Sequence, residues 1–554
     1  MLYDEIEQEI EKMQSSNPKL REESIDSLLR ISQGIGKPYT VQYLIPFIKT
    51  ILDTNEEAKI PILQQIEKIV KEVLNEIKPV YVLYREIFLT RSDLIREQAS
   101  ASLISSLNVK KIDYEIFGIE EFIVSLGESR FIMHRISAIT VMRTLIGEIP
   151  AGTELRKLKS LFSQMQNDPL PIVRRKSILS PEIIQYFYTE QEIQKIIERV
   201  LEDTDDTVRS CFISPLFLLS KTKDNGYFNL EIFKKASKDN SWKVRSSSTK
   251  IIKEVAVYLY AIKSTHTGIS ILDCIDRLVE DREEAVRKSI IERAPDILAE
   301  APDTKNKILY IIDKASCDVS SEVREIVPEV LSKISEIITK EDVELYISPI
   351  VRRLLTDEDQ KTKMETIGKL KTLYNKLGAA AITDALTPVI NDLESSNWRT
   401  RTAVLKSISS LSRQMDKMYF QDYLKQPFFK MFIDPIWNVR KEAAVILGEI
   451  SINFGAAWVC GDMLESLEFL KESSHYAHRI SYATAIGKVL QTLWPRKVQK
   501  MLAKGLLQLS QDPIPQVRMT VAKMVSQGIL EEKKEILLRM QTDSHPEVIS
   551  ASKV

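Results

Sequence analysis

The sequence predicts an all-α protein, an α-solenoid in which about fifteen pairs of antiparallel helices stack side by side. The first observation is a near-repeat, because DPIWNVR at 434–440 returns as DPIPQVR at 512–518. The second is an arginine that recurs at intervals of roughly 40 residues, a period typical of helical repeat proteins. The third is a set of apolar residues at helical spacing after these arginines.

The repeated arginine marks the same place in each predicted repeat. Equal steps separate Arg401, Arg440, Arg479 and Arg518, and the other steps along the chain are of similar length. The remaining members are Arg96, Arg135, Arg174, Arg209, Arg245, Arg287 and Arg324, with Arg21, Lys59 and Lys363 in equivalent places. The string HPEVI near Ile549 continues the series as a shortened last copy.

Each repeat is predicted to contain a first helix, a short polar turn and a second helix. Segments 43–52 and 345–355 have the apolar pattern of first helices, and Val439, Ala443 and Ile446 give a second helix its apolar face. The aspartate in most turns is expected to accept N–H groups at the positive helix end. The repeated arginine is expected to bind the aspartate of its own or the neighbouring turn, so that a ladder fixes the stacking.

The composition favours one array over residues 1–554 and excludes several classes of partner. Lys plus Arg number 77 against 78 Asp plus Glu, so the formal net charge of −1 provides no global field for nucleic acid or an anionic membrane. The 21 Pro and 16 Gly are scattered and mark no linker. An acidic, amphipathic N-terminus and the lack of a long apolar run predict no signal peptide and no membrane span.

Cysteine, histidine and glycine patterns offer little for catalysis. The four cysteines are far apart, which indicates a reducing compartment; we expect the cytoplasm, with the nucleus as a second location. GIGK at 34–37 is too short for a phosphate loop and is expected to end a helix. Cys460, His475 and His478 could form a zinc site, but an exposed turn explains both histidines more simply. No catalytic motif occurs, so we expect no enzyme, no cofactor and no metal.

Large aromatic residues stand in the polar turns, three residues before the repeated arginine. They are Trp242, Trp398, Trp437 and Tyr476. A ring at such a place either folds back on the next repeat or is available to a partner. Because the last three are equally spaced along the chain, they are expected to line up on one ridge, which favours the partner interpretation.

The period, the helical pattern and the D-x-x-x-x-V-R turn resemble HEAT repeats. The order of the turns is similar to that of the scaffolding A subunits of protein phosphatase 2A, a family with fifteen HEAT repeats. The turns that carry this resemblance are NDPLPIVRR in repeat five, SWKVR in seven, NWRTR in eleven, WNVRKEAA in twelve, HYAHR in thirteen and PQVRMTVAK in fourteen. The resemblance covers the whole chain in repeat order and is strongest from about 395 to 525.

The resemblance implies a non-catalytic scaffold that binds two other subunits. Repeats eleven to fifteen, at residues 385–554, would bind the phosphatase catalytic subunit through Trp398, Arg399, Trp437, Tyr476, His478, Ile514 and Gln516. Repeats one to seven, at residues 1–265, would bind B-type regulatory subunits through Asp168, Pro171, Arg174, Arg175, Trp242, Lys243 and Arg245. We expect Trp398 and Arg399 to form the energetic centre of the catalytic-subunit interface.

Two departures from the family pattern and two rival functions accompany this interpretation. The second helix of the last repeat is short, and Lys243 stands where the family has arginine, although lysine lacks the planar fork. A nuclear transport receptor or another HEAT-repeat adaptor is the rival with the same architecture, although no long acidic run occurs here. An enzyme is the rival of a different class.

Overall fold

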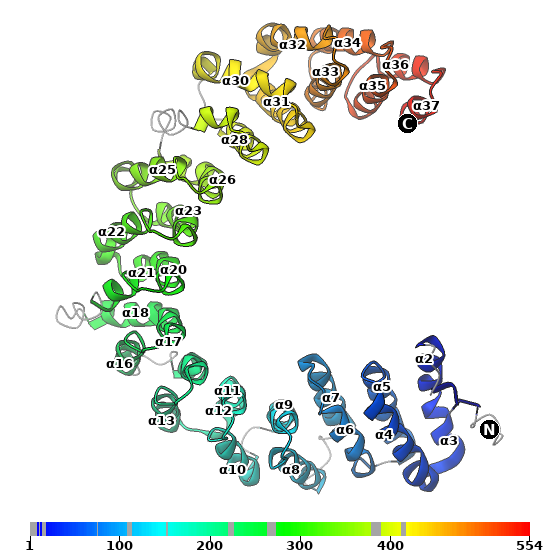
Figure 1. Ribbon diagram of the computed structural model, residues 1–554, viewed down its shortest axis with the longest axis vertical. Helices are drawn as coiled ribbons and strands as arrows, with labels where there is room; N and C mark the ends of the chain where they lie inside the picture. Colours follow the sequence, from blue (N-terminus) through cyan, green and yellow to red (C-terminus); the bar gives the residue numbers. More distant parts are fainter. Residues whose placement is uncertain are drawn as a thin grey trace. The chain divides into compact units, whose positions relative to one another are not determined.

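A computed structural model describes residues 8–9, 11–13, 18–74, 76–107, 114–150, 153–219, 226–262, 273–377, 389–411 and 417–553. Contacts along the chain divide it into two compact units, Met1–Cys274 and Ile275–Val554, which we call unit 1 and unit 2. Every regular element in the described ranges is helical (Figure 1). The prediction of an all-α fold built from antiparallel helix pairs is confirmed.

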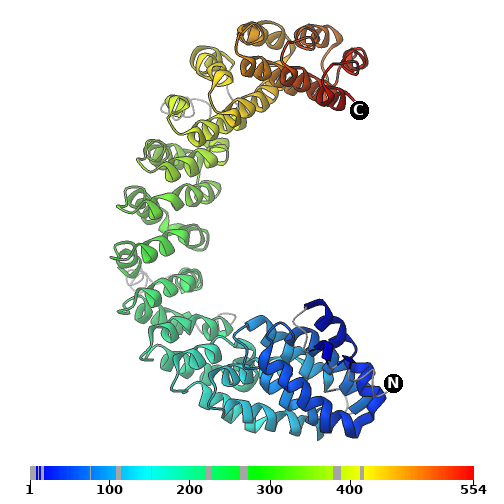
Figure 2. The ribbon, with the colours of Figure 1, turned by 45° about the vertical axis from the view of Figure 1, so that its right-hand side comes forward.

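Unit 1 is a stack of short helix pairs. The second helix of each pair contacts the second helix of the next pair along the chain. Its α-helices are α2 (Pro18–Asp26), α3 (Leu28–Tyr39), α4 (Ile45–Thr54), α5 (Lys59–Ile69), α6 (Tyr81–Ile87), α7 (Asp93–Ser106), α8 (Tyr114–Gly127), α9 (Ile132–Glu148), α10 (Arg156–Met165), α11 (Pro171–Ile178), α12 (Pro181–Phe187), α13 (Glu190–Val200), α14 (Asp206–Arg209), α15 (Ile213–Leu219), α16 (Gly226–Ala236), α17 (Trp242–Ser248) and α18 (Ile252–Ile262). Helix α5 packs on α7, and α7 packs on α9. Figure 2 shows these helices side by side.

Unit 2 repeats the same plan with longer second helices. Its described α-helices include α20 (Glu284–Glu292), α21 (Ala294–Glu300), α22 (Lys305–Ala315), α23 (Ser321–Ile337), α24 (Lys340–Asp342), α25 (Ser348–Leu355), α26 (Gln360–Leu377), α28 (Trp398–Leu411), α29 (Lys417–Tyr419), α30 (Lys425–Lys430), α31 (Trp437–Trp458), α32 (Leu464–Lys471), α33 (Tyr476–Val489), α34 (Arg496–Leu509), α35 (Pro515–Gln527), α36 (Lys533–Met540) and α37 (Pro546–Ser552). The second helices α28, α31, α33, α35 and α37 each pack on the next. Figure 1 shows α31, α33, α35 and α37 on one face and α30, α32, α34 and α36 on the other.

The apolar spacing of the sequence explains which face of each helix is buried. Helix α13 buries Ile193, Ile196 and Ile197, which lie on one side of a 3.6-residue period. Its start is fixed by a capping box, because the Thr189 hydroxyl and the Glu192 carboxylate accept N–H groups from each other's residue. The same stripe recurs in helix after helix, so stacking produces one continuous core along each unit.

Two glycines with positive φ break helices that would otherwise continue. Gly36 has φ 76° in the GIGK segment, so the helix end predicted there is confirmed. Gly455 has φ 82° and interrupts α31 in the same way. The stretch Trp437–Lys471 has the length and apolar composition of a membrane-crossing helix, but Gly455 lies inside it and 50% of its most apolar window is buried in the protein. Its buried side chains, such as Ile446 and Leu447, belong to the core of unit 2.

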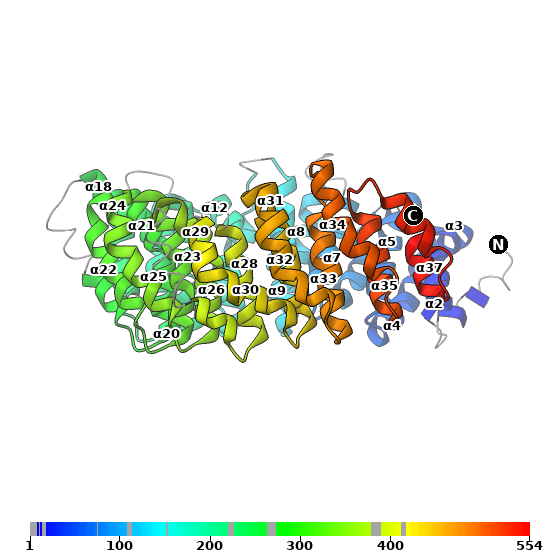
Figure 3. The same ribbon diagram turned by 90° about the horizontal axis from the view of Figure 1, so that it is seen from above.

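Several first helices are preceded by a wider turn of the π type, namely η1 (Thr40–Leu44), η8 (Val343–Ile347), η10 (Phe420–Leu424) and η12 (Val459–Met463). A further segment of this type, η2 (Val70–Leu74), ends the second helix α5. The helices of unit 2 run side by side across the stack, with their connecting turns at its two edges (Figure 3). One of these edges carries the turns with the repeated arginine. These exposed turns are the candidate binding surface of the unit.

Candidate functional site: a ridge of turns on unit 2

Each repeated arginine holds two consecutive turns together. Arg401 donates from Nε and Nη2 to the two carboxylate oxygens of Asp434 in the next repeat, at 2.7 and 3.0 Å. Its Nη1 donates to the carbonyl oxygens of Ser395 and Ser396 in its own turn, at 2.6 and 3.3 Å. The planar guanidinium can make both sets of bonds at once because its donors point in fixed directions.

The same two-oxygen fork recurs in both units, which confirms the predicted ladder. Its members are the pairs Arg174 with Asp203, Arg209 with Asp239, Arg287 with Asp318, Arg324 with Asp357, Arg401 with Asp434, Arg479 with Asp512, and Arg518 with Asp543. Arg135 forms an ion pair with Asp168, with Nε 2.9 Å from Oδ2, and its Nη2 donates to Oδ1 at 3.4 Å. In each of these pairs the partner is the aspartate of the following repeat, so the ladder links neighbouring helix pairs.

The turn aspartates act differently from the predicted helix caps. Asp434 accepts the N–H of Ile436 at 2.8 Å, and the helix α31 begins only at Trp437. The carboxylate therefore closes a turn ahead of the helix and caps no N–H inside it, so the capping prediction is wrong for this turn. Asp205 is an exception, because it accepts N–H groups of Thr207 and Val208 in α14.

The ladder carboxylates are expected to make the fold sensitive to acid. Burial opposes ionisation of Asp318, but the Arg287 guanidinium and the Ser320 N–H outweigh it and hold its pKa below the ordinary 3.8. Hydrogen bonds from Arg518 lower the pKa of Asp543. A pKa lowered by folding stabilises the protein above the unfolded value and loses that effect as the pH falls through the folded value. The melting temperature, followed by circular dichroism, should therefore fall as the pH is lowered below about 4.

A matched variant separates the ladder from general acid denaturation. Asp543→Asn removes one titrating carboxylate of the ladder and keeps the size of the side chain. Its loss of melting temperature between pH 5 and 3 should be smaller than that of the parent protein, because one fewer lowered pKa has to be titrated. Equal losses in both proteins would show that the rung contributes nothing to the acid response.

The aromatic residues predicted to form a ridge lie at the first positions of successive second helices. Trp398 begins α28, Trp437 begins α31 and Tyr476 begins α33. The side chain of Trp437 is 43% exposed and that of Tyr476 is 47% exposed, whereas Trp398 is half-buried. Since α28 packs on α31 and α31 on α33, the three rings lie on neighbouring turns. We call these turns, 395–399, 434–437, 473–478 and 512–516, the docking ridge.

Cations lie over the two tryptophan rings of the docking ridge. The Arg399 guanidinium carbon lies 4.7 Å from the Trp398 ring centroid, and that of Arg440 lies 5.5 Å from the Trp437 ring centroid. Arg399 itself is exposed to solvent. These stacks hold each indole in place and leave an amphipathic surface of ring and guanidinium, which is the chemistry that protein interfaces use most often for strong contacts.

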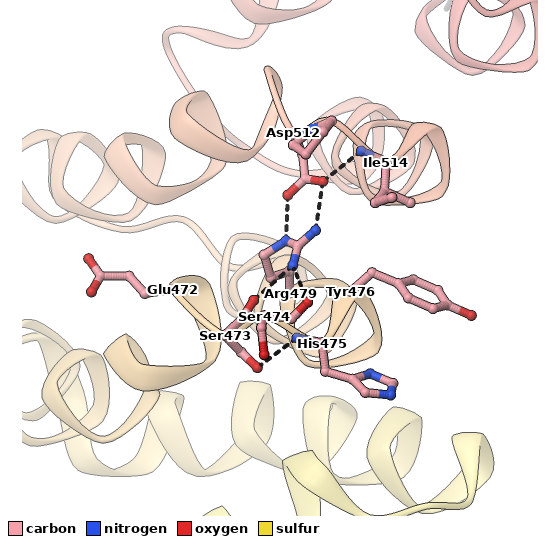
Figure 4. A pocket seen from close by; sticks show the side chains of 9 residues that line it. Glu472, Ser473, Ser474, His475, Tyr476, Arg479, Asp512 and Ile514 are labelled. Carbon is pink, nitrogen blue, oxygen red and sulfur yellow. Dashed lines mark hydrogen bonds and ion pairs between the residues drawn. The ribbon is translucent and has the colours of Figure 1, made fainter.

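The last two turns of the docking ridge enclose a shallow open depression (Figure 4). Its lining residues are Glu472, Ser473, Ser474, His475, Tyr476, Arg479, Asp512, Pro513 and Ile514. At its floor Arg479 forks onto Asp512 at 2.6 and 3.0 Å, while Tyr476 and His475 point away from that pair. The fork leaves no free charge on the floor, so the exposed rings and the exposed Glu472 carboxylate determine what this surface can bind.

The remaining predicted residues of the docking ridge differ in how open they are. Gln516 is exposed, and Ile514 and His478 are half-buried. His478 Nδ1 lies 2.9 Å from Ser473 Oγ in a hydrogen bond. Burial lowers the pKa of His478, and the nearby His475 and Arg440 lower it further. The histidine is therefore neutral at neutral pH and can offer a polar contact without charge.

Sequence reasoning missed two features of the docking ridge. Ile436, 37% exposed, lies directly beside Trp437 and widens the apolar surface. Arg440 does not follow the ladder prediction, since it makes no bond to an acidic side chain in the described residues. Aligning the turns would have shown the second feature, because position 473 is serine where the turns before and after it have Asp434 and Asp512.

The residues predicted for regulatory-subunit binding divide into structural and exposed groups. Asp168, Arg174 and Arg245 are bonded within the turns of unit 1, the first two as ladder members. Pro171 is the first residue of α11 and is half-buried. The side chains left at the surface are those of Arg175, Trp242 and Lys243. Lys243 forms an ion pair with Asp206 at 3.3 Å, and Trp242 is 42% exposed.

Metal-ligand chemistry finds no support in the described part of the chain. Among those residues no group of three or more His, Cys, Asp or Glu side chains lies close enough to hold a metal ion. His475 and His478 stack with ring centroids 5.0 Å apart, and Tyr476 stacks on His475. Both histidines belong to the aromatic surface of their turn. The four cysteines are free thiols.

Comparison with known proteins supports the fold class. Neither a protein-family model nor a curated protein matches the chain. Solved structures do match it: Kap121p bound to Ste12p has a TM-score of 0.59 at 12% identity, covering 95% of this chain and 57% of that one. A Kap121p mutant has a TM-score of 0.55 at 13% identity, covering 100% and 68%, and Kap121p bound to Pho4p has 0.53 at 12%, covering 100% and 65%.

These likenesses define the class of protein to which the fold belongs. The chain is an α-solenoid of the HEAT-repeat type, the architecture of Kap121p. It spans about 57% to 68% of the length of the Kap121p chains that it matches. At 12 to 13% identity the likeness extends to the fold alone.

Proposed function

We propose that the protein is a non-catalytic scaffold that binds another protein along the docking ridge of unit 2. The observation that carries this proposal is the row of rings at the starts of α28, α31 and α33, two of them 43% and 47% exposed. The ladder fixes the turns that present these rings, so a partner would meet a preorganised surface. Exposed aromatic rings beside arginine are the usual centres of protein interfaces.

The partner that the turns favour is the catalytic subunit of protein phosphatase 2A. Support comes from the order of the turns NWRTR, WNVRKEAA, HYAHR and PQVRMTVAK, which resembles that of the scaffolding A subunits. A B-type regulatory subunit would then bind unit 1, with Arg175, Trp242 and Lys243 as the surface residues available to it. Holding both subunits on one chain raises their effective concentration toward each other, which needs no chemistry from the scaffold. Such a complex belongs in the cytoplasm and the nucleus.

A nuclear transport receptor or another adaptor is the second candidate, and the structural likeness to Kap121p is the observation that favours it. This candidate shares the architecture and the protein-binding mode but predicts a different partner. It requires a surface for a cargo protein or for a small GTPase in place of a phosphatase. The two candidates therefore differ in a binding experiment and agree in every measurement of the fold.

Isothermal titration calorimetry with purified full-length chain distinguishes the two candidates. The titrants are the catalytic subunit of protein phosphatase 2A and, separately, a small GTPase of the nuclear transport system loaded with GTP. Binding of the phosphatase with a Kd in the nanomolar to micromolar range supports the scaffold. Binding of the GTPase alone would replace this proposal with the transport receptor. Phosphatase activity of the purified chain without any other subunit would contradict both.

A further inference from the structure

The arginine ladder is open at one position of the docking ridge, between α31 and α33. Arg440 donates from Nη1 to the carbonyl oxygens of Asp434 and Pro435, at 2.6 and 3.2 Å, as Arg401 and Arg479 do in their own turns. Its guanidinium is therefore held in the ladder orientation. Its Nε is buried without a hydrogen-bond partner in the described residues, and Nη2 makes no bond there either.

The missing partner is explained by one residue. Arg401 binds Asp434 and Arg479 binds Asp512, each 33 residues further along the chain. The residue in the same register after Arg440 is Ser473, whose hydroxyl pairs with His478 and does not reach the guanidinium. A buried guanidinium N–H without an acceptor is costly, since the lost hydrogen bond to water is not replaced. Burial accordingly lowers the pKa of Arg440, against the opposing effect of Asp434 and Tyr476.

A second position, in unit 1, also lacks the aspartate of the ladder, and its arginine is paired differently. Position 129 is also serine, and Ser129 pairs with His134 at 2.9 Å as Ser473 does with His478. There Arg96 Nη2 forms an ion pair with Asp93, three residues before it, while Arg96 Nε is buried without a hydrogen-bond partner in the described residues, as Arg440 Nε is. At Arg440 the residue three positions before is Trp437. Three residues before the arginine, the chain therefore has a carboxylate at Arg96 and an exposed aromatic ring at Arg440.

We infer that Arg440 binds the carboxylate of an aspartate or glutamate side chain on the protein that docks on the ridge. This inference rests on the proposed function, because it names the group that the partner contributes. Arg440 Nη2 makes no bond to the described residues and is not among the enclosed atoms, whereas Nε is buried. Nη2 can therefore donate to a carboxylate oxygen of the partner, as Nη2 of Arg401 and Nη2 of Arg479 do within the ladder. Trp437 and Tyr476 on either side exclude water from such a pair, which strengthens it. The partner residue completes the ladder from outside.

Ser473→Asp tests this inference with a variant that should fold well. The new carboxylate stands where Asp434 and Asp512 stand in their rungs, so it should bind Arg440 and raise the melting temperature. It should also exclude the carboxylate of the partner and lower the affinity for the phosphatase catalytic subunit by roughly ten- to a hundredfold. Ser544→Asp adds the same charge at an exposed position of the turn before α37, outside the docking ridge, and should leave both values close to those of the parent.

The outcomes separate this inference from the proposed function. If the parent binds the phosphatase and Ser473→Asp binds equally well, the scaffold stands and the inference fails. If the parent does not bind the phosphatase, the inference is judged on the free protein by NMR of arginine labelled with ¹⁵N. The Nε resonance of Arg440 is the one that is lost in Arg440→Lys. Glutarate, which carries carboxylates, should shift this resonance, and the uncharged glutaramide should not. The inference is overturned if glutarate does not shift the Arg440 Nε resonance, or if it shifts that resonance equally in Ser473→Asp. It is also overturned if inorganic phosphate alone shifts the resonance, because the position would then bind a phosphate group.

Discussion

Trp398→Ala is expected to weaken binding of the phosphatase catalytic subunit by about 2 to 4 kcal/mol. Trp398 is half-buried at the start of α28, and the Arg399 guanidinium lies over its ring at 4.7 Å. Truncation removes the ring and the support of the arginine together, so two contacts of the interface are lost at once. Calorimetry at a temperature well below the melting transition measures the change, and circular dichroism checks that the helices remain.

Trp242→Ala is the matched control for this prediction. Trp242 begins α17 in unit 1, precedes its arginine by the same three residues and is 42% exposed. Its removal should leave the affinity for the catalytic subunit unchanged, because it lies outside the docking ridge. If Trp398→Ala bound as tightly as the parent, or if both variants weakened binding alike, the docking ridge would not be the interface.

Asp434→Ala is expected to lower the free energy of unfolding of the C-terminal repeats by about 3 to 5 kcal/mol. Asp434 and Arg401 form the most enclosed rung, with side chains 4% and 9% exposed. Removing the carboxylate leaves a buried guanidinium unpaired and frees the N–H of Ile436 as well. Urea denaturation followed by circular dichroism gives the energy. Hydrogen exchange should show faster opening where α28 meets α31, because a stacked array opens locally.

Glu394→Ala provides the comparison on the same face. Glu394 pairs with Lys430 at 2.8 Å, but the two side chains are 66% and 60% exposed. A solvent-exposed ion pair contributes at most about 1 kcal/mol, so the variant should be nearly as stable as the parent. Equal destabilisation by Asp434→Ala and Glu394→Ala would mean that burial of the rung has no energetic importance.

The sequence was sufficient for the fold and for the ladder because both depend on local spacing. Arginines separated by one repeat length place equivalent side chains at equivalent turns, and their aspartates follow from the same period. The bond from Arg401 to Asp434 therefore needed no knowledge of the wider structure. The helix end at Gly36 was predictable for the same reason, since a glycine after an apolar run is a common stop signal.

Other features depend on contacts that a single sequence does not reveal. Trp398, Trp437 and Tyr476 occupy equivalent positions, yet the first is half-buried and the other two are exposed. The capping prediction was wrong at Asp434 because two further residues separate the carboxylate from α31.

The double grip of each guanidinium has a mechanical consequence for unit 2. Because Arg401 and Arg479 each bond to two turns, a displacement of one turn is expected to move the next turn with it. Between α31 and α33 this direct linkage is absent, and the packing of the two helices alone holds that joint. A partner that binds both turns would supply the missing link between them. Binding at this one joint would therefore reduce the flexibility of unit 2.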